Sequence, residues 1–418
     1  MKVVVIAGGQ GTRIASVNNE IPKAMIPING KPVLEYEIEM AVRYGYTDFL
    51  FIIGYLGDQI ESYFGDGGKW GIRIDYFKEE KPLGTAGALG YLKAELTEDF
   101  FVFYGDTVMD FDMNAMLDYH KEKKADATLF LHPNDHPYDS DIVDLDAEGK
   151  VREFYNKPHA PGFISRNMVN AALFIFSPKI VSQIECGVKS HIEKNVLPAC
   201  LEAGMNLYGY LSFEYIKDMG TPDRYYSVCE DVRSGKVKRM NRRNSRPAIF
   251  LDRDGVLSKE VDLLCKPEQL ELIEGVGEAI RYINRKGYLA IVVTNQPVIA
   301  RNMCSIKELD HIHAKLETLL GAEHAYLNAI YYCPHHPHGG YPEERKEYKM
   351  KCSCRKPEPG MLLKAADDWN IDISQSYMIG DRPSDVQAGE NAGCKQSVQI
   401  EQNKPYALLD ALKSILEN

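Results

Sequence analysis

The sequence predicts an α/β protein made of two doubly wound domains. Two observations carry this prediction: short apolar runs typical of strands alternate with helix-like stretches, and the pattern starts afresh halfway along the chain, at residue 246. A length of 418 residues also exceeds what one ordinary core accommodates. The front half supplies strand-like runs at 3–7, 49–55, 72–77 and 100–104, and helix-like stretches at 33–44 and 85–94. Later runs at 151–155, 169–176 and 207–213 are expected to be added strands around a substrate site.

Composition excludes several classes of protein. Hydrophobic residues make up 44% of the chain and charged residues 26%, which is typical of a soluble globular protein. A net charge of -11 argues against nucleic acid or an anionic membrane as the main partner, so small phosphorylated molecules would meet local Arg, Lys and metal ions. Nine cysteines are too few for a disulfide scaffold, and no apolar run is long enough for a secretory signal or a bilayer span. We expect a cytoplasmic protein, and the oligomeric state stays open.

A glycine-rich loop follows the first strand. It reads Ala7-Gly8-Gly9-Gln10-Gly11-Thr12-Arg13, and its missing side chains would let backbone N–H groups approach a polyphosphate. The loop matches neither the dinucleotide-binding Gly-x-Gly-x-x-Gly nor the Walker loop, and a plain glycine turn is the alternative. Arg13 and Lys23 add two cations nearby, as attack on a triphosphate requires.

These motifs together resemble the sugar-1-phosphate nucleotidylyltransferases. Gly-Gly-x-Gly-Thr-Arg is followed by Pro-Lys-x-Met-x-Pro-x-x-Gly-Lys-Pro. Four further stretches agree in order, at 83–88, 104–106, 156–158 and 218–222. The resemblance implies that a sugar 1-phosphate oxygen attacks the α-phosphorus of a nucleoside triphosphate and expels pyrophosphate, with charge placement supplying most of the catalysis.

The same resemblance implies roles for individual residues. Arg13 and Lys23 would neutralise the triphosphate, and Asp106 and Asp218 would hold Mg²⁺, although a strand-end Asp commonly only satisfies a turn. The nucleotide and sugar phosphate would be bound by Gly8, Gly9, Gly11, Thr12, Gly84, Thr85, Lys157 and Asn170. Two sugar-facing positions depart from the family pattern, since Asn156 replaces a usual Glu and Ala172 replaces a usual Gly. The identity of the sugar is therefore not fixed by the motifs.

A basic, polar stretch separates the halves at residues 233–246. Its composition is that of a linker. We expect a transferase domain at 1–236, a basic linker at 237–246 and a second domain at 247–418. The linker would be either a solvated connector or a contact with an acidic face.

The back half predicts a second doubly wound sheet whose strands end in polar residues. Expected strands at 248–251, 289–293, 329–332 and 377–379 alternate with helices starting at 276, 306, 360 and 383. Asp252 and Asp254 follow the first strand, where one acid can attack while the other moves a proton; an Asp that caps the next helix is the alternative.

With Thr294, Lys356 and Asp381 in the same order, this half resembles the haloacid-dehalogenase-type phosphatases. The resemblance implies that Asp252 forms an aspartyl-phosphate and that Asp254 protonates the leaving oxygen and then activates water. Thr294, with Asn295 nearby, would bind the phosphoryl group, and Lys356 would offset its charge. Mg²⁺ would be held by Asp252, the Asp254 carbonyl and Asp381.

A cysteine and histidine cluster predicts a structural Zn²⁺ site. The ligands would be Cys333, His335, Cys352 and Cys354, in two close pairs across a polar loop. Thiols in a buried strand are the alternative, and His336 and His338 compete for the histidine role.

This zinc loop, followed by Arg355-Lys356-Pro357, resembles a narrower group, the heptose 1,7-bisphosphate 7-phosphatases and the related histidinol-phosphate phosphatases. Arg355, Arg253 and Arg301 would bind a second, non-reacting phosphate. Pro297-Val298 replaces the frequent Ser-Gly after Asn-Gln, which alters the substrate loop.

The two halves together predict consecutive steps in the synthesis of a nucleotide-activated heptose. The phosphatase would produce heptose 1-phosphate, which the transferase would activate with GTP, a donor implied only by the resemblance to guanylyltransferases. Two alternatives stay open: one domain is only a binding or regulatory module, or a histidinol-phosphate-type phosphatase is joined to an unrelated hexose-1-phosphate transferase.

Overall fold

The computed structural model describes residues 1–9, 14, 20–340 and 343–417, and it divides into two compact units. The first contains residues 1–132, 143–156 and 170–242; the second contains 133–142, 157–169 and 243–418. Gly11, Thr12 and Arg13 lie outside the described residues. None of the described helices is long and apolar enough to cross a membrane.

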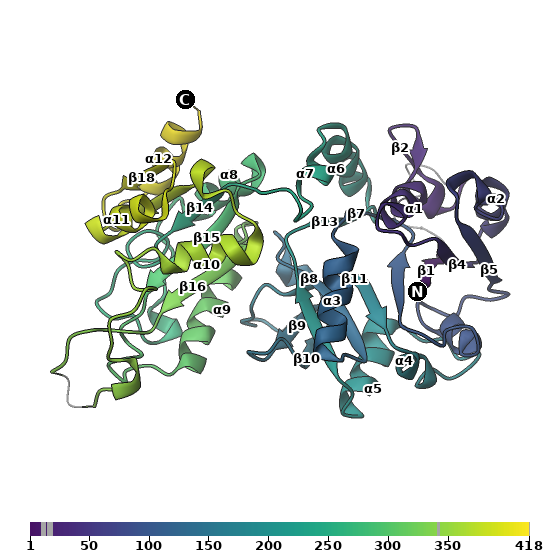
Figure 1. Ribbon diagram of the computed structural model, residues 1–418, viewed down its shortest axis with the longest axis horizontal. Helices are drawn as coiled ribbons and strands as arrows, with labels where there is room; N and C mark the ends of the chain where they lie inside the picture. Colours follow the sequence, from purple (N-terminus) through teal and green to yellow (C-terminus); the bar gives the residue numbers. More distant parts are fainter. Residues whose placement is uncertain (10–13, 15–19, 341–342, 418) are drawn as a thin grey trace. The chain divides into compact units, whose positions relative to one another are not determined.

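The first unit is built on a mixed sheet of nine strands with the order β10-β9-β11-β6-β1-β4-β5, in which β8 pairs with β11 and β12 (Figure 1). At its centre β1 (Val3–Ala7) lies parallel to β4 (Asp48–Ile53) and β6 (Phe100–Tyr104). The sequence of β1 is entirely apolar because a central parallel strand is covered on both faces. The other strands are β5 (Arg73–Lys78), β8 (Ala127–His132), β9 (Ile142–Leu145), β10 (Val151–Tyr155), β11 (Val169–Phe176) and β12 (Leu207–Leu211).

A separate antiparallel pair joins β7 (Thr107–Asp110) to β13 (Tyr215–Asp218). The α-helices of this unit are α1 (Val33–Arg43), α2 (Gly57–Phe64), α3 (Met113–Lys123), α4 (Pro178–Ser182), α5 (Leu197–Glu202), α6 (Pro222–Arg233) and α7 (Lys236–Arg239). Helix α1 begins at Val33 as predicted and buries Leu34, Ile38 and Ala41 against the sheet core.

The prediction of a helix at 85–94 is wrong. The structure has only a 3-10 helix, η4 (Gly87–Leu92), in its place. Gly84 has φ +78°, and a Cβ there would come within 2.2 Å of the Ser190 carbonyl oxygen; a Cβ on Gly87 would come within 2.5 Å of the Val188 oxygen. The glycines are therefore needed for close packing against a distant backbone segment, which a local pattern does not reveal.

The basic stretch after α6 is not a solvated connector as far as Arg242. Helix α7 covers Lys236–Arg239, and the buried Asn241 donates to Asp110 Oδ1 at 2.7 Å. The Arg242 N–H donates to Glu214 Oε1 at 2.9 Å. The stretch thus binds acidic side chains of the first unit.

The second unit contains a five-stranded sheet with the order β16-β15-β14-β17-β18, and all its pairs are parallel. The strands are β14 (Ala248–Leu251), β15 (Leu289–Asn295), β16 (Ala329–Cys333), β17 (Tyr377–Gly380) and β18 (Gln396–Gln399). The α-helices are α8 (Val276–Lys286), α9 (Ile306–Ala322), α10 (Gly360–Trp369), α11 (Pro383–Ala392) and α12 (Ala407–Leu416). This order confirms the doubly wound prediction and places the topological switch between β14 and β17.

Two segments of the front half, 133–142 and 157–169, belong to the second unit, which the linear domain boundaries did not anticipate. Arg166 donates to Glu317 at 2.7 Å and to Asp310 at 2.6 Å, both on α9. The Asn167 N–H also donates to Glu317, at 3.0 Å. These bonds tie the segment 157–169 to α9.

Candidate active sites and metal centre

In the first unit, Lys23 and Asp106 form an ion pair. Lys23 starts the short 3-10 helix η2 (Lys23–Met25), and Asp106 lies just beyond the end of β6. Asp218 ends β13 opposite Thr107, and the Met219 N–H donates to the Asp106 carbonyl at 3.1 Å. The β7–β13 pair therefore brings the two predicted Mg²⁺ carboxylates to one end of the same ladder.

Asp218 is held by a cation that the sequence motifs did not identify. Arg224, in the first turn of α6, donates to Asp218 Oδ2 at 2.7 Å, and the Gly220 N–H donates to Oδ1 at 2.6 Å. Burial raises the pKa of Asp218, but Arg224, the Gly220 N–H and Lys23 together lower it below its ordinary value. Asp218 is thus a stable carboxylate that could take a metal ion in exchange for Arg224.

Thr85 and Asn170, predicted to contact substrate, bond to the chain itself. Thr85 Oγ1 accepts from the Ile192 N–H at 2.9 Å. Asn170 Oδ1 accepts from the Ala172 N–H at 3.1 Å, and Ala172 has φ +56°, a conformation that favours the glycine usual at this position. Packing within the protein also accounts for the glycine at position 8, because a Cβ there would lie 2.4 Å from Glu79 Oε2. A Cβ on Gly9 would meet no atom within 4 Å.

Lys157 lies in the second unit, in the segment 157–169. Its Nζ donates to the Asp139 carbonyl at 2.8 Å, and its N–H donates to Asp141 Oδ1 at 3.0 Å. Both acceptors belong to the neighbouring segment 133–142.

In the second unit, three acids converge at the topological switch. Asp252 follows β14, Asp381 follows β17, and Asp385 lies in the first turn of α11. One carboxylate oxygen from each of the three lies within 4.8 Å of the other two, and all three residues are buried. Asp381 Oδ1 has no hydrogen-bond partner although it is buried. Buried oxygen donors at this spacing fit a hard divalent cation.

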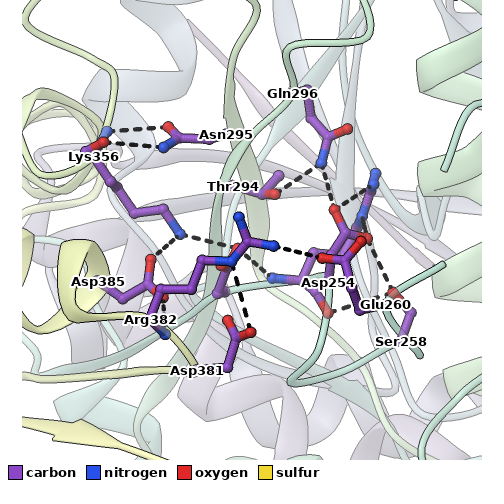
Figure 2. Close-up of polar contacts among 12 residues, drawn as sticks. Asp254, Ser258, Glu260, Thr294, Asn295, Gln296, Lys356, Asp381, Arg382 and Asp385 are labelled. Carbon is purple, nitrogen blue, oxygen red and sulfur yellow. Dashed lines mark hydrogen bonds and ion pairs between the residues drawn. The ribbon is translucent and has the colours of Figure 1, made fainter. Parts of the chain in front are cut away.

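Lys356 supplies the positive charge of this group (Figure 2). Its Nζ lies 2.9 Å from Asp252 Oδ1 and 2.7 Å from Asp385 Oδ1, and its side chain is 1% exposed. Asn295 fixes the Lys356 backbone: its Nδ2 donates to the Lys356 carbonyl at 3.1 Å, and its Oδ1 accepts the Lys356 N–H at 3.0 Å. Asn295 thus positions Lys356. The neighbouring Thr294 lines the cavity that surrounds Asp252 and Lys356.

Asp254 is tied to its neighbours in this structure. Arg253 donates to its two carboxylate oxygens at 2.9 and 2.8 Å, and Gln296 donates to it at 2.8 Å. Burial raises the pKa of Asp254, but Arg253, Gln296 and Ser258 together lower it. Burial raises the pKa of Asp252 to about 7 despite Lys356. A cation bound by Asp252 would lower that pKa again.

The cavity around this group measures about 250 Å³ and is lined by two arginines. One is Arg355, predicted from sequence to bind a second phosphate, whose Nη1 donates to the His335 carbonyl at 3.1 Å. The other is Arg382, which the motifs did not single out. Arg253, also predicted to meet the second phosphate, is fully buried in this structure and pairs with Asp254 instead of lining the cavity. Arg301 is not among the described residues that line the cavity.

The four predicted zinc ligands converge. The Sγ atoms of Cys333, Cys352 and Cys354 lie 3.2–3.5 Å apart, and His335 Nδ1 lies 3.4 Å from Cys354 Sγ and 3.7 Å from Cys333 Sγ. These separations are close to those of donors that share one tetrahedral ion with bonds of about 2.0–2.3 Å. His336, which competed for the histidine role, instead forms a hydrogen bond with the His338 backbone: its Nδ1 lies 3.0 Å from the His338 carbonyl oxygen. The donor set fits Zn²⁺ with no position left for water.

Asp385, Arg382 and Arg224 were missed because the motifs do not show which side chains meet. For Asp385 a signal existed: it follows Asp381 by four residues, in Gly380-Asp381-Arg382-Pro383-Ser384-Asp385, so a strand-end acid and a helix-start acid share one turn.

Comparison with known proteins separates the two halves. Residues 2–235 match the family model for nucleotidyl transferases, which is more than half of the chain. The chain belongs to the nucleotidyl transferase family. Residues 353–400 match the HAD-hydrolase-like family model.

Three relatives extend this assignment. The D-glycero-beta-D-manno-heptose-1,7-bisphosphate 7-phosphatase of Haemophilus ducreyi is 41% identical over 160 residues, which are 38% of this chain and 85% of that protein. The mannose-1-phosphate guanylyltransferase of Mycobacterium tuberculosis is 32% identical and covers 56% of this chain. The UTP–glucose-1-phosphate uridylyltransferase of Synechocystis is 30% identical and covers 57%. The chain spans 64% and 65% of these two transferases. It is thus an enzyme with a nucleotidyltransferase domain and a HAD-type phosphatase domain.

Proposed function

We propose that the chain catalyses two consecutive steps in the synthesis of a nucleotide-activated heptose. It removes the 7-phosphate of D-glycero-D-manno-heptose 1,7-bisphosphate and transfers GMP from GTP to the resulting heptose 1-phosphate, releasing pyrophosphate. One observation carries the proposal: a domain 41% identical to a heptose-bisphosphate 7-phosphatase shares one chain with a sugar-1-phosphate nucleotidyltransferase domain. The product of the first reaction belongs to the substrate class of the second.

In the phosphatase reaction, an Asp252 oxygen attacks the phosphorus of the 7-phosphate, and the bond from phosphorus to the sugar oxygen breaks. Asp254 would take up a proton once bound substrate frees it from Arg253, which holds its pKa low in this structure; it then gives that proton to the leaving oxygen, and the sugar departs as an alcohol. Asp254 then accepts a proton from a water molecule whose oxygen attacks the aspartyl-phosphate, and inorganic phosphate leaves. Lys356 offsets the charge around Asp252 throughout. Asp252, Asp381 and Asp385 would hold Mg²⁺, which lessens the repulsion between carboxylate and phosphate.

In the transferase reaction, the sugar 1-phosphate oxygen attacks the α-phosphorus of the nucleotide, and pyrophosphate leaves without a covalent enzyme intermediate. Lys23 would neutralise the triphosphate once substrate or metal releases it from Asp106. Asp106 and Asp218 would hold Mg²⁺, which supplies charge neutralisation at the phosphates. GTP is supported by the guanylyltransferase relative, and the uridylyltransferase relative makes UTP the competing donor.

Substrate panels test the proposal. Pyrophosphate release is measured for each nucleoside triphosphate with heptose, mannose and glucose 1-phosphates, and phosphate release for heptose 1,7-bisphosphate beside histidinol phosphate. We expect the highest kcat/KM for GTP with heptose 1-phosphate and for the heptose bisphosphate. A preference for mannose 1-phosphate together with histidinol phosphate would replace the proposal by the fusion of unrelated activities. Transfer absent from every pair would make the first unit a binding module, for which the altered positions Asn156 and Ala172 would be the reason.

A further inference from the structure

An ion pair at the phosphatase cavity takes no part in the steps above. Arg382 Nη2 lies 2.8 Å from Glu260 Oε2, and both residues line the cavity that contains Asp252 and Lys356. Figure 2 shows the Arg382 guanidinium between the carboxylates of Glu260 and Asp381, with Arg382 Nε 3.8 Å from Asp381 Oδ2. The Arg382 side chain is 58% exposed. A cation is therefore available to a ligand that enters the cavity.

The Glu260 side of the pair is held in place. The Glu260 N–H donates to Asn403 Oδ1 at 2.7 Å, and Glu260 Oε1 accepts from the Asp262 N–H at 3.0 Å. Its other oxygen, Oε2, is the one that binds Arg382. Glu260 is thus a fixed negative charge, and the long Arg382 side chain is the partner that can move.

The other cations that line the cavity already have partners inside the protein. The Lys356 ammonium lies between the buried Asp252 and Asp385, and Arg355 Nη1 donates to the His335 carbonyl. Arg382 is 58% exposed and Glu260 is 20% exposed, so water screens the pair from the Arg382 side and weakens it. A planar guanidinium can donate two parallel hydrogen bonds to a phosphate. A phosphate dianion carries more charge than the Glu260 carboxylate, so it should bind Arg382 more strongly.

We propose that Arg382 binds the second, non-reacting phosphate of a sugar bisphosphate, and that Glu260 holds Arg382 until this phosphate displaces it. The inference rests on the proposed phosphatase function. Arg382 takes the place that the sequence had assigned to Arg253 and Arg301. Glu260 makes the site selective, because its charge repels a second phosphate that does not engage Arg382. A substrate with an ammonium group would have the opposite requirement: it would be attracted by Glu260 and repelled by Arg382.

The two partners can be tested with opposite expected signs, using the full-length protein in Mg²⁺. Arg382→Met should raise the KM for heptose 1,7-bisphosphate by about tenfold or more, the loss typical of a hydrogen bond to a charged group. Hydrolysis of p-nitrophenyl phosphate, which lacks a second phosphate, should stay within about twofold. Glu260→Gln keeps an oxygen for the Asp262 N–H but releases Arg382, so the KM for the bisphosphate should fall by about threefold. Lys259→Met is the control, since it breaks an exposed pair with Glu271 that does not line the cavity.

The outcomes separate this inference from the function on which it rests. Inhibition of p-nitrophenyl phosphate hydrolysis by the bisphosphate reports binding even where the bisphosphate is not turned over. If wild type does not hydrolyse the bisphosphate but Arg382→Met still weakens that inhibition, the substrate proposal fails and the phosphate site stands. The inference is overturned if Arg382→Met raises the KM for both substrates equally, or leaves both the KM and the inhibition unchanged. It is also overturned if Glu260→Gln weakens bisphosphate binding as much as Arg382→Met does.

Discussion

Replacing Asp385 by Asn removes one charge from the acidic group at the topological switch and keeps the shape of the side chain. Asp385 is 1% exposed, and its Oδ2 accepts the Arg382 N–H at 2.9 Å at the start of α11. An Asn can still accept this bond through its carbonyl oxygen, so α11 should remain intact. What changes is the charge: the acidic group keeps two of its three carboxylates, and the Lys356 ammonium keeps its ion pair with Asp252 but loses the one with Asp385.

The expected magnitude follows from this count of charges. A contact to a charged group contributes about 1.5–3 kcal/mol, so the variant should need about 10–150-fold more Mg²⁺ for half-maximal phosphatase activity. The stability of the metal-free protein should change much less. Removing the Asp385 charge relieves repulsion within the acidic group but also ends the 2.7 Å ion pair with Lys356, so the two effects on the melting temperature in EDTA oppose each other.

The assay is hydrolysis of p-nitrophenyl phosphate across a Mg²⁺ titration, together with thermal unfolding in EDTA and in excess Mg²⁺. Asp367→Asn, at an exposed position on α10, serves as the control for a generic loss of charge. An unchanged Mg²⁺ requirement in Asp385→Asn would refute the reasoning. So would a rise of the melting temperature on adding Mg²⁺ as large as in the wild type, because Asp385 would then contribute nothing to metal binding.

Two further predictions concern the second unit. Cys354→Ser should lower the bound zinc, measured by elemental analysis, from about one ion per chain to well below that, and should make the melting temperature insensitive to chelators. The control Cys186→Ser, at an exposed cysteine outside the cluster, should retain wild-type zinc. Full zinc in Cys354→Ser would contradict the assignment. Burial, and next the nearby Arg253, lower the pKa of His313 well below its ordinary value near 6.5. Below pH 6.5 the imidazole is therefore protonated in the unfolded chain but stays neutral in the folded chain. The free energy of unfolding should fall as the pH drops below 6.5. Between pH 7.5 and pH 5, the free energy of urea unfolding should therefore fall by up to about 2 kcal/mol less in His313→Gln than in wild type. The control His311→Gln, at an exposed position on the same helix, should follow wild type. Equal losses in all three proteins would disprove the prediction.

Local patterns predicted much of the fold and most of the candidate site in the second unit. Asp252 and Asp381 follow buried parallel strands, and strand ends meet at one edge of such a sheet, so their proximity could be expected from sequence. The zinc set could be expected for a similar reason, since two close pairs of ligands bracket one loop.

What could not be predicted depends on contacts between distant segments. The stretch 85–94 has helical spacing, but its glycines pack on the backbone near Ser190. Arg253 follows Asp252 directly, yet it is buried and pairs with Asp254, while Arg382, which follows another strand, lines the cavity. The segment 157–169 joins the second unit through Arg166, a pairing between residues about 150 positions apart along the chain. No local signal encodes such pairings.

The central claim is that one chain holds two independent catalytic sites, and parallel assays of two variants test it most directly. Phosphate release from the heptose bisphosphate and pyrophosphate release from GTP with heptose 1-phosphate are measured for Asp252→Asn and Asp106→Ala, after circular dichroism shows that both are folded. We expect Asp252→Asn to lose phosphate release and keep nucleotidyl transfer near the wild-type rate, and Asp106→Ala to show the reverse. Loss of both activities in either folded variant would contradict the account.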